Sequence, residues 1–293
     1  MTKTRAMAVV AMLSLAAAAC AKAPATGGGP PGAIPHLTGA GQVVLRIANE
    51  GGFVSPQILQ LQIPQFSLFG DGTVVTVGPQ IDIYPGAALP PVLSQHLTED
   101  GVQAVLRAAL DAGLGEQHPD LGNLGSVGAS DMATTVFTFD ANGATTTLKV
   151  YALGAGRSPN MNDAEYKVRR QLQGLAAKLG TLEQWLPPGS ITAALPLDPA
   201  GARVYVSDYR PDPQLDEPQM AWPLSTPLAT FGSAAVTGTI GGGGQRCGSV
   251  TGSDWATKLR PLAAKANQLT PWTSQGFRYD LAFRPLLPDE KGC

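Results

Sequence analysis

The chain has 293 residues, 25 of them proline and 35 glycine, and a formal net charge of -2 at pH 7. Nucleic-acid binding depends on a clustered basic face, and this charge balance gives no sign of one, so no nucleic-acid partner is expected. The length suffices for one large or two modest hydrophobic cores, and the many prolines and glycines indicate numerous loops.

The first 19 residues have the layout of a signal peptide. Lys3 and Arg5 supply positive charge, and residues 6–19 follow without a charged side chain. A membrane-spanning helix needs about 20 apolar residues, and this run is too short for one. Cleavage after residue 19 would remove both basic side chains and lower the formal net charge from -2 to -4.

The residues at the predicted cleavage site, Ala17-Ala18-Ala19-Cys20, resemble the bacterial lipobox. The resemblance implies that Cys20 becomes the first residue and carries lipid, with acyl chains such as palmitate. Ala17 departs from the Leu that the family usually has there, and secretion without lipid is the alternative. Two or more acyl chains suffice for stable anchoring. We therefore expect a lipoprotein on the extracytoplasmic face of the cell membrane, with the membrane as a partner.

The body is predicted to be an α+β protein with two mixed domains, each a small, largely antiparallel sheet with one or two packed helices. Residues 20–40 contain little bulky apolar surface and predict a flexible tether. Pro187-Pro188-Gly189 would stop a helix and predicts a boundary between a first domain, 41–187, and a second, 188–293.

Two β-hairpins and two amphipathic helices are predicted in the first domain. Glycine-containing turns predict the hairpins, and capping residues with a three- and four-residue apolar spacing predict the helices. The elements are a strand over 43–48, a hairpin of 66–69 and 73–77 about Gly70-Asp71-Gly72, a helix from Thr98 to Gly113, a hairpin of 134–139 and 145–151 about Asn142-Gly143, and a helix starting at Asn162 or Asp163.

Strands over 203–209, 247–250 and 277–283 and a helix over 254–267, shortened or kinked by Pro261, are predicted in the second domain. With Cys20 lipidated, Cys247 and Cys293 remain, and an oxidising exterior favours a disulfide between them. The chain-entropy model gives such a bond about 4 kcal/mol of stabilisation. Two free thiols are the alternative.

No catalytic residue, metal ligand set or cofactor site is predicted. His36, His96 and His118 lie far apart in the sequence, without the spacing of a zinc site. No nucleophile elbow or phosphate-binding loop is present, and glycines 241–244 are interpreted as a hinge or loop. The carboxylate pairs Asp216-Glu217 and Asp289-Glu290 lie in proline-rich loops, and a glycosidase pair comes from separate elements, which sequence can neither find nor exclude.

Trp222, Trp255 and Trp272 all lie in the last third of the chain. Exposed tryptophans anchor interfaces, but the positions of these three favour burial in a core. We therefore expect them to be core residues rather than contacts to a partner.

Two family resemblances are present. Residues 43–186, through Gly51-Gly52-Phe53, a Leu/Ala-rich helix and a Thr-rich hairpin, resemble the emfourin type of metalloprotease-inhibitor domain, from which the chain departs by an insertion over 54–97. The whole chain resembles uncharacterised lipoproteins of high-GC Gram-positive bacteria through Phe69-Gly70-Asp71-Gly72, Ile83-Tyr84-Pro85-Gly86 and residues 284–288. The second resemblance implies a location and a domain plan, without an activity.

Three hypotheses of function follow. The first is a non-catalytic binding or interaction protein that recognises an unknown envelope protein or ligand. The second is an envelope-anchored protease inhibitor, implied by the emfourin resemblance. The third is a hydrolase whose carboxylates converge only in the folded protein.

Overall fold

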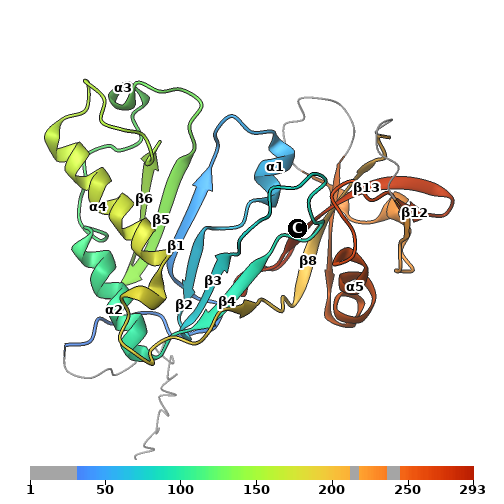
Figure 1. Ribbon diagram of the computed structural model, residues 1–293, viewed down its shortest axis with the longest axis horizontal. Helices are drawn as coiled ribbons and strands as arrows, with labels where there is room; N and C mark the ends of the chain where they lie inside the picture. The colour runs from blue at the N-terminus through green and yellow to red at the C-terminus, as the bar shows by residue number, and fades with distance from the viewer. Residues whose placement is uncertain (1–31, 212–217, 236–244) are drawn as a thin grey trace, which may run out of the picture.

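The computed structural model describes residues 32–211, 218–235 and 245–293. It confirms an α+β protein built from two sheet-based domains (Figure 1). Within these ranges no helix is both long and apolar enough to cross a membrane. The expected signal peptide, Cys20 and the glycines 241–244 lie outside the described residues, as does the pair Asp216-Glu217.

The first sheet has seven antiparallel strands in the order β6-β5-β1-β2-β3-β4-β7. Helices α2 and α4 cover one of its faces, which we call the helix face, and the opposite face is called the rear face (Figure 1). The elements are β1 (Val43–Glu50), α1 (Pro56–Leu61), β2 (Phe66–Phe69), β3 (Thr73–Val77), β4 (Val92–His96), α2 (Glu99–Asp111), α3 (Leu124–Val127), β5 (Thr134–Ala141), β6 (Ala144–Tyr151), α4 (Asp163–Leu179), η1 (Leu182–Gln184) and β7 (Leu195–Pro196).

Both predicted hairpins and both predicted helices are present. Asn142 and Gly143 have φ of 56° and 76°, the left-handed values that a two-residue primed turn requires. Asn162 caps α4 by accepting a hydrogen bond from the Glu165 N–H at 2.9 Å. Thr98 occupies the N-cap position of α2, but its side chain makes no capping hydrogen bond.

The second sheet has six strands in the order β10-β11-β8-β13-β12-β9, with only β12 and β9 parallel. Its elements are β8 (Gly201–Asp208), β9 (Met220–Ala221), η2 (Leu228–Thr230), β10 (Ser233–Ala234), β11 (Arg246–Thr251), the π-helix η3 (Asp254–Leu259), α5 (Arg260–Ala263), β12 (Trp272–Ser274) and β13 (Phe277–Pro285). The helix predicted over 254–267 ends at Ala263, and Pro261 lies in the first turn of its α-helical part.

The second core lies between this sheet and the η3–α5 helix. Trp222, Trp255 and Trp272 are buried in it, as predicted. Trp272 packs edge-on against Trp222 and Phe283, with ring centroids 6.4 and 5.5 Å apart. Edge-on aromatic pairs stabilise a protein by more than the apolar area that they bury, so these tryptophans stabilise the second core.

The predicted boundary at 187 is wrong, because the first sheet continues past it. Ile191 forms a bridge with Leu97, and Leu195 and Pro196 form β7 against β4. The helical elements α4 and η1 already end at Leu179 and Gln184, before the prolines, and the domain continues beyond them.

The tether predicted over 20–40 is also too long, because residues near its C-terminal end pack against the first domain. The backbone N–H and C=O of Ile34 both hydrogen-bond the buried Gln103 side chain of α2, at 2.8 and 2.9 Å. Leu37 packs against the first core, and Pro35 C=O accepts the Asn142 N–H. Residues 34–37 are therefore part of the domain.

Candidate functional site

The segment after β13, residues 286–293, leaves the second sheet and lies on the rear face of the first. We call it the strap. Its Leu287 is buried against Phe69, Val75 and Val92, the apolar side chains on that part of the rear face. The strap therefore joins the two domains, and Figure 1 shows it ending between the two sheets.

Asp289 of the strap is held by an arginine of the first sheet. Both terminal nitrogens of Arg46, in β1, donate to its two carboxylate oxygens at 2.8 Å. Arg46 Nε donates to Ser67 Oγ of the neighbouring strand β2 at 3.0 Å. This two-bond geometry is the strongest that an arginine and a carboxylate form, and it fixes the strap relative to β1.

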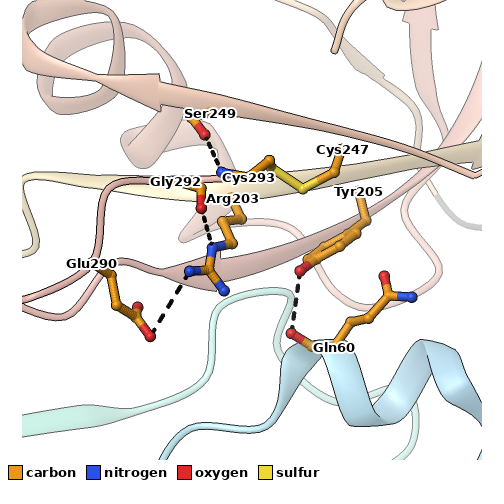
Figure 2. Close-up of a disulfide and its surroundings, with 8 residues drawn as sticks. All are labelled: Gln60, Arg203, Tyr205, Cys247, Ser249, Glu290, Gly292 and Cys293. Atoms are coloured by element: carbon orange, nitrogen blue, oxygen red, sulfur yellow. Dashed lines mark hydrogen bonds and ion pairs between the residues drawn. A yellow bond between two sulfur atoms is a disulfide. The ribbon is translucent and has the colours of Figure 1, made fainter. Parts of the chain in front are cut away.

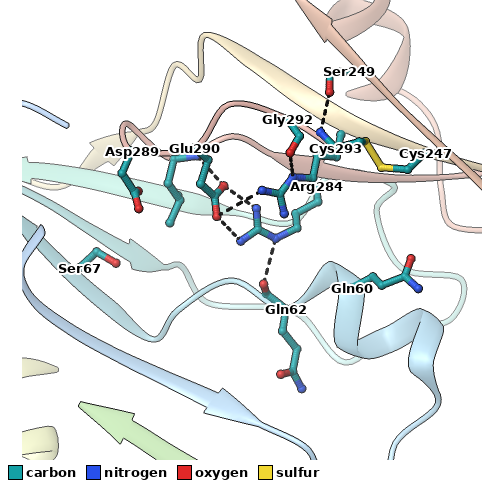
Figure 3. Close-up of polar contacts among 12 residues, drawn as sticks. Gln60, Gln62, Ser67, Cys247, Ser249, Arg284, Asp289, Glu290, Gly292 and Cys293 are labelled. Carbon is teal, nitrogen blue, oxygen red and sulfur yellow. Dashed lines mark hydrogen bonds and ion pairs between the residues drawn. A yellow bond between two sulfur atoms is a disulfide. The ribbon is translucent and has the colours of Figure 1, made fainter. Parts of the chain in front are cut away.

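Glu290 is held by arginines of the second sheet. Arg284 donates to its two carboxylate oxygens at 2.5 and 2.7 Å, and Arg203 Nη2 lies 4.0 Å from Oε1 (Figures 2 and 3). Arg203 and Arg284 are cross-strand neighbours in β8 and β13, where like charges repel. The carboxylate between them offsets that repulsion.

Helix α1 completes this junction between the domains. Arg284 Nε donates to the backbone C=O of Gln62 at 3.0 Å, and Tyr205 Oη donates to the C=O of Gln60 at 3.3 Å (Figures 2 and 3). The last backbone carbonyls of a helix have no hydrogen-bond donor within the helix. At α1, Arg284 and Tyr205 of the second sheet each donate to one of these carbonyls. The second sheet therefore contacts both α1 and the strap.

Both strap carboxyls have a pKa below the ordinary value. Burial raises the pKa of Asp289, but the hydrogen bonds and charge of Arg46 outweigh it and give a net decrease. Burial likewise raises the pKa of Glu290, and hydrogen bonds from Arg284 and the Leu287 N–H outweigh it. Both groups are thus held as carboxylates with partners, which suits a structural junction and not a catalytic acid.

The predicted disulfide between Cys247 and Cys293 is confirmed, and it attaches the end of the strap to β11 (Figure 2). The two Cα atoms are 5.8 Å apart. Cys293 N–H donates to Ser249 Oγ at 2.9 Å, and Arg203 Nε donates to the Gly292 C=O at 2.9 Å. The bond thus adds a covalent link to a junction that is otherwise held by Leu287 and by polar contacts.

A different surface lies at one end of the first sheet, where loops follow β1 and β3 and precede β5. Large apolar side chains are exposed there, and we call this surface the apolar end. The exposed apolar residues there are Phe53, Val54, Ile58 and Met132, near β1 and β5, and Val77, Ile81, Ile83 and Tyr84, from the end of β3 onward. Three other large apolar residues, Leu124, Leu195 and Phe277, are also exposed in the described ranges. Exposed apolar side chains of this size make this end of the sheet a candidate interaction surface.

The strand pairing places the starts of the loops after β1 and β3 at the same end of the sheet. Ile47 pairs with Phe66 and Phe66 with Thr76, so β1 and β3 end at the same edge of the sheet, separated only by β2. Neighbouring strands are about 4.8 Å apart, so the two chains leave the sheet roughly 10 Å from each other. Phe53 N–H donates to Asp131 C=O at 3.0 Å, which joins the loop before β5 to the same surface.

The apolar end lies opposite the N-terminal side of the described chain. Pro35 contacts Asn142, just after β5 ends, whereas Phe53 contacts Asp131, just before β5 begins. The eight residues of β5 separate these contacts, which corresponds to roughly 25 Å at the rise of a strand. The apolar end is therefore at one end of the strands of the first sheet. The segment that leads back to Cys20 joins the sheet at the other end of the strands.

A groove beside α4, the α4 groove, opens next to the apolar end. It has two adjoining parts of about 580 and 490 Å³, which share Gln65 and Ala176 as lining residues. Met132 lines the first part, and Glu183 is the single carboxylate among the lining residues. Gln95 Nε2 donates to Glu183 Oε1 at 2.9 Å. The groove offers apolar and amide surface, without a carboxylate pair.

The other candidate residues have local structural roles. Asp71 Oδ1 accepts the Thr73 N–H at 2.9 Å, as expected of a turn residue, and His118 Nε2 contacts the Gly113 C=O at 2.7 Å. His36 lies 3.2 Å from Glu99 Oε1. Across the described ranges, no group of three His, Cys, Asp or Glu side chains is arranged to hold a metal ion.

The sequence marked Asp289-Glu290 only as a carboxylate pair in a proline-rich loop, and its partners Arg46, Arg203 and Arg284 were missed. The alternation of Arg203 and Arg284 with buried apolar residues was a usable signal, because it places both arginines on the face of the second sheet away from its core.

Comparisons with protein-family models, curated proteins and solved structures found no match for this chain.

Proposed function

We propose that this protein is a lipid-anchored, extracytoplasmic binding protein that contacts a partner in the cell envelope through the apolar end. The observation that carries the proposal is the set of exposed apolar side chains on the loops that leave that end of the sheet, with Phe53 88% and Ile81 78% exposed. A solvent-exposed aromatic side chain gains most by burial against a partner.

The position of the apolar end supports the proposal. Lipid on Cys20 would hold the chain at the membrane through residues 20–33, and these join the first sheet on the edge opposite Phe53. The apolar end would then face away from the anchoring membrane, toward the envelope.

The membrane part of the proposal is tested by changing Cys20 to Ser. We expect the variant to appear in the soluble fraction or as an uncleaved precursor, because no acyl chain can be attached. A cleaved product that stays with the membrane would contradict the lipid anchor.

The binding part is tested by capturing partners from intact envelopes with the wild type and with Phe53→Asp. Phe277→Asp is the matched control, because Phe277 is 68% exposed on β13, away from the apolar end. We expect the Phe53 variant to lose a captured protein that the control retains. Equal capture by both variants, or capture of nothing by the wild type, would contradict the proposal.

The variant Gly174→Gln distinguishes binding at the apolar end from binding in the α4 groove. Gly174 lines the groove, and no atom lies within 4 Å of an added Cβ there, so a longer side chain can project into the space without strain. If the partner binds at the apolar end, this variant should still capture it. Loss of capture with Gly174→Gln but not with Phe53→Asp would place the partner in the groove instead.

Protease inhibition is the second candidate, favoured by the position of Phe53. It follows Gly51 and Gly52, whose φ angles of 66° and 89° favour glycine, and its side chain projects from the loop. An exposed apolar side chain on a short loop can fill the specificity pocket of a thermolysin-like protease. We expect inhibition that weakens by about 30-fold or more in Phe53→Ala but not in Phe277→Ala. Undiminished turnover with excess wild type would exclude it.

A further inference from the structure

The strap is held in two ways that differ along its length. Its first half carries the buried Leu286 and Leu287 and the paired Asp289 and Glu290. Residues 291–293 carry no apolar side chain other than the cysteine and are held by the disulfide and two hydrogen bonds. The covalent bond is therefore the main attachment of the outer end.

The outer end lies very close to β11. Gly292 has φ of 111°, and a Cβ added there would lie 2.2 Å from Ser249 Oγ. This close approach leaves no space for a side chain between strap and strand. The disulfide is nevertheless accessible from one side, because Cys293 is exposed whereas Cys247 is buried.

We propose that the Cys247–Cys293 disulfide is a reducible latch, and that its reduction by an external dithiol releases the strap from the rear face of the first sheet. A thiolate of the dithiol attacks the sulfur of Cys293, the more exposed residue of the pair, and Cys247 leaves as a thiolate. The second thiol of the reductant then resolves the mixed disulfide and frees Cys293. The protein gains two electrons and two protons, and the dithiol becomes a disulfide.

Release of the strap would change the rear face of the first sheet. Leu287 would leave Phe69, Val75 and Val92, and Arg46 would lose the Asp289 carboxylate. The ion pairs oppose this release, so reduction raises the fraction of open molecules and does not open them all. The inference is independent of the proposed function, because it concerns the junction and not the apolar end.

Hydrogen exchange of the full folded chain, with and without dithiothreitol, tests the latch. The amides of Leu287, Glu290 and Cys293 are hydrogen-bonded to Glu290, Leu287 and Ser249 respectively. We expect their exchange to accelerate about tenfold or more on reduction and to stay faster than that of the β5 amides. A disulfide that resists the dithiol in the native protein, or unchanged exchange after reduction, would overturn the proposal.

Cys293→Ser provides a second test without a reductant. It keeps the size of the residue, and its strap amides should exchange like those of the reduced wild type. If the strap amides exchange no faster than the β5 amides in either sample, the strap opens only when the protein unfolds as a whole, and the local latch is refuted. If Cys293→Ser does not fold, dithiothreitol treatment of the folded wild type still tests whether the strap opens on reduction.

Discussion

The strap junction and the apolar end use side chains in opposite ways. At the junction, Arg46, Arg203 and Arg284 all have oxygen partners in the protein, and Leu287 is buried. At the apolar end, Phe53 and Ile81 project into solvent without a protein surface to cover them. Groups whose interactions are satisfied within the protein stabilise the fold, whereas exposed apolar surface remains free for another molecule. The difference separates a structural region from a candidate binding region.

The largest effect on stability should come from removing the disulfide. Changing both Cys247 and Cys293 to Ser should lower the free energy of unfolding by about 4 kcal/mol, because the open segment gains conformational freedom when unfolded. Urea denaturation of the two proteins measures the difference. The wild type in reductant should approach the variant, and equal midpoints for all three samples would show that the junction depends on its non-covalent contacts alone.

Breaking the Arg46–Asp289 pair should have the next largest effect. Asp289→Ala leaves a mostly buried guanidinium without its carboxylate, which should cost about 2 kcal/mol of unfolding free energy. In the double variant Arg46→Met with Asp289→Leu, apolar contacts replace the pair, and much of the loss should be recovered. A single variant as stable as the wild type would show that the pair adds nothing to the junction.

Acid should weaken the junction through Asp289 and Glu290. Their pKa values are lower in the folded than in the unfolded protein, so their contribution is present above the unfolded values, near 3.8 and 4.5, and is lost as the pH falls through the folded values. The urea midpoint should therefore fall below about pH 4.5.

Asp280 acts in the opposite direction, because burial raises its pKa more than the hydrogen bond and charge of Arg210 lower it. Comparing the wild type with Asp289→Asn removes this contribution from the measurement. The variant should lose less stability than the wild type between pH 5 and pH 3, and parallel curves would contradict the role of Asp289.

The smallest effect on stability is expected at the apolar end. Phe53→Asp should change the unfolding free energy by less than about 0.5 kcal/mol, because Phe53 is exposed and makes few contacts that could be lost. Thermal unfolding beside Phe277→Asp measures it. A loss above 2 kcal/mol would mean that Phe53 stabilises the fold, and the contrast with the junction would fail.

Local features of the fold were predictable from sequence. The Gly70-Asp71-Gly72 and Asn142-Gly143 turns, the Asn162 cap and the cysteine pair each depend on short-range chemistry or on simple counting. These signals gave the hairpins, the helices and the disulfide.

Contacts between distant parts of the chain were not predictable. Arg46 and Asp289 are separated by 243 residues, and no local pattern marks them as a pair. In the same way Ala88, from the loop between β3 and β4, packs in the second core, and β7 follows a proline–glycine stop yet returns to the first sheet. The apolar end was missed because exposure of Phe53 depends on the absence of neighbours, which only the folded chain reveals.

The separation between β1 and the strap also has a consequence in time. A ribosome adds about 5 to 20 residues per second, so the 243 residues between Arg46 and Asp289 take roughly 12 to 50 seconds to make. During that interval Phe69, Val75 and Val92 have no Leu287 to cover them. An unfinished chain therefore exposes apolar side chains on the rear face of its first domain. We expect this face to promote aggregation until the strap has been synthesised.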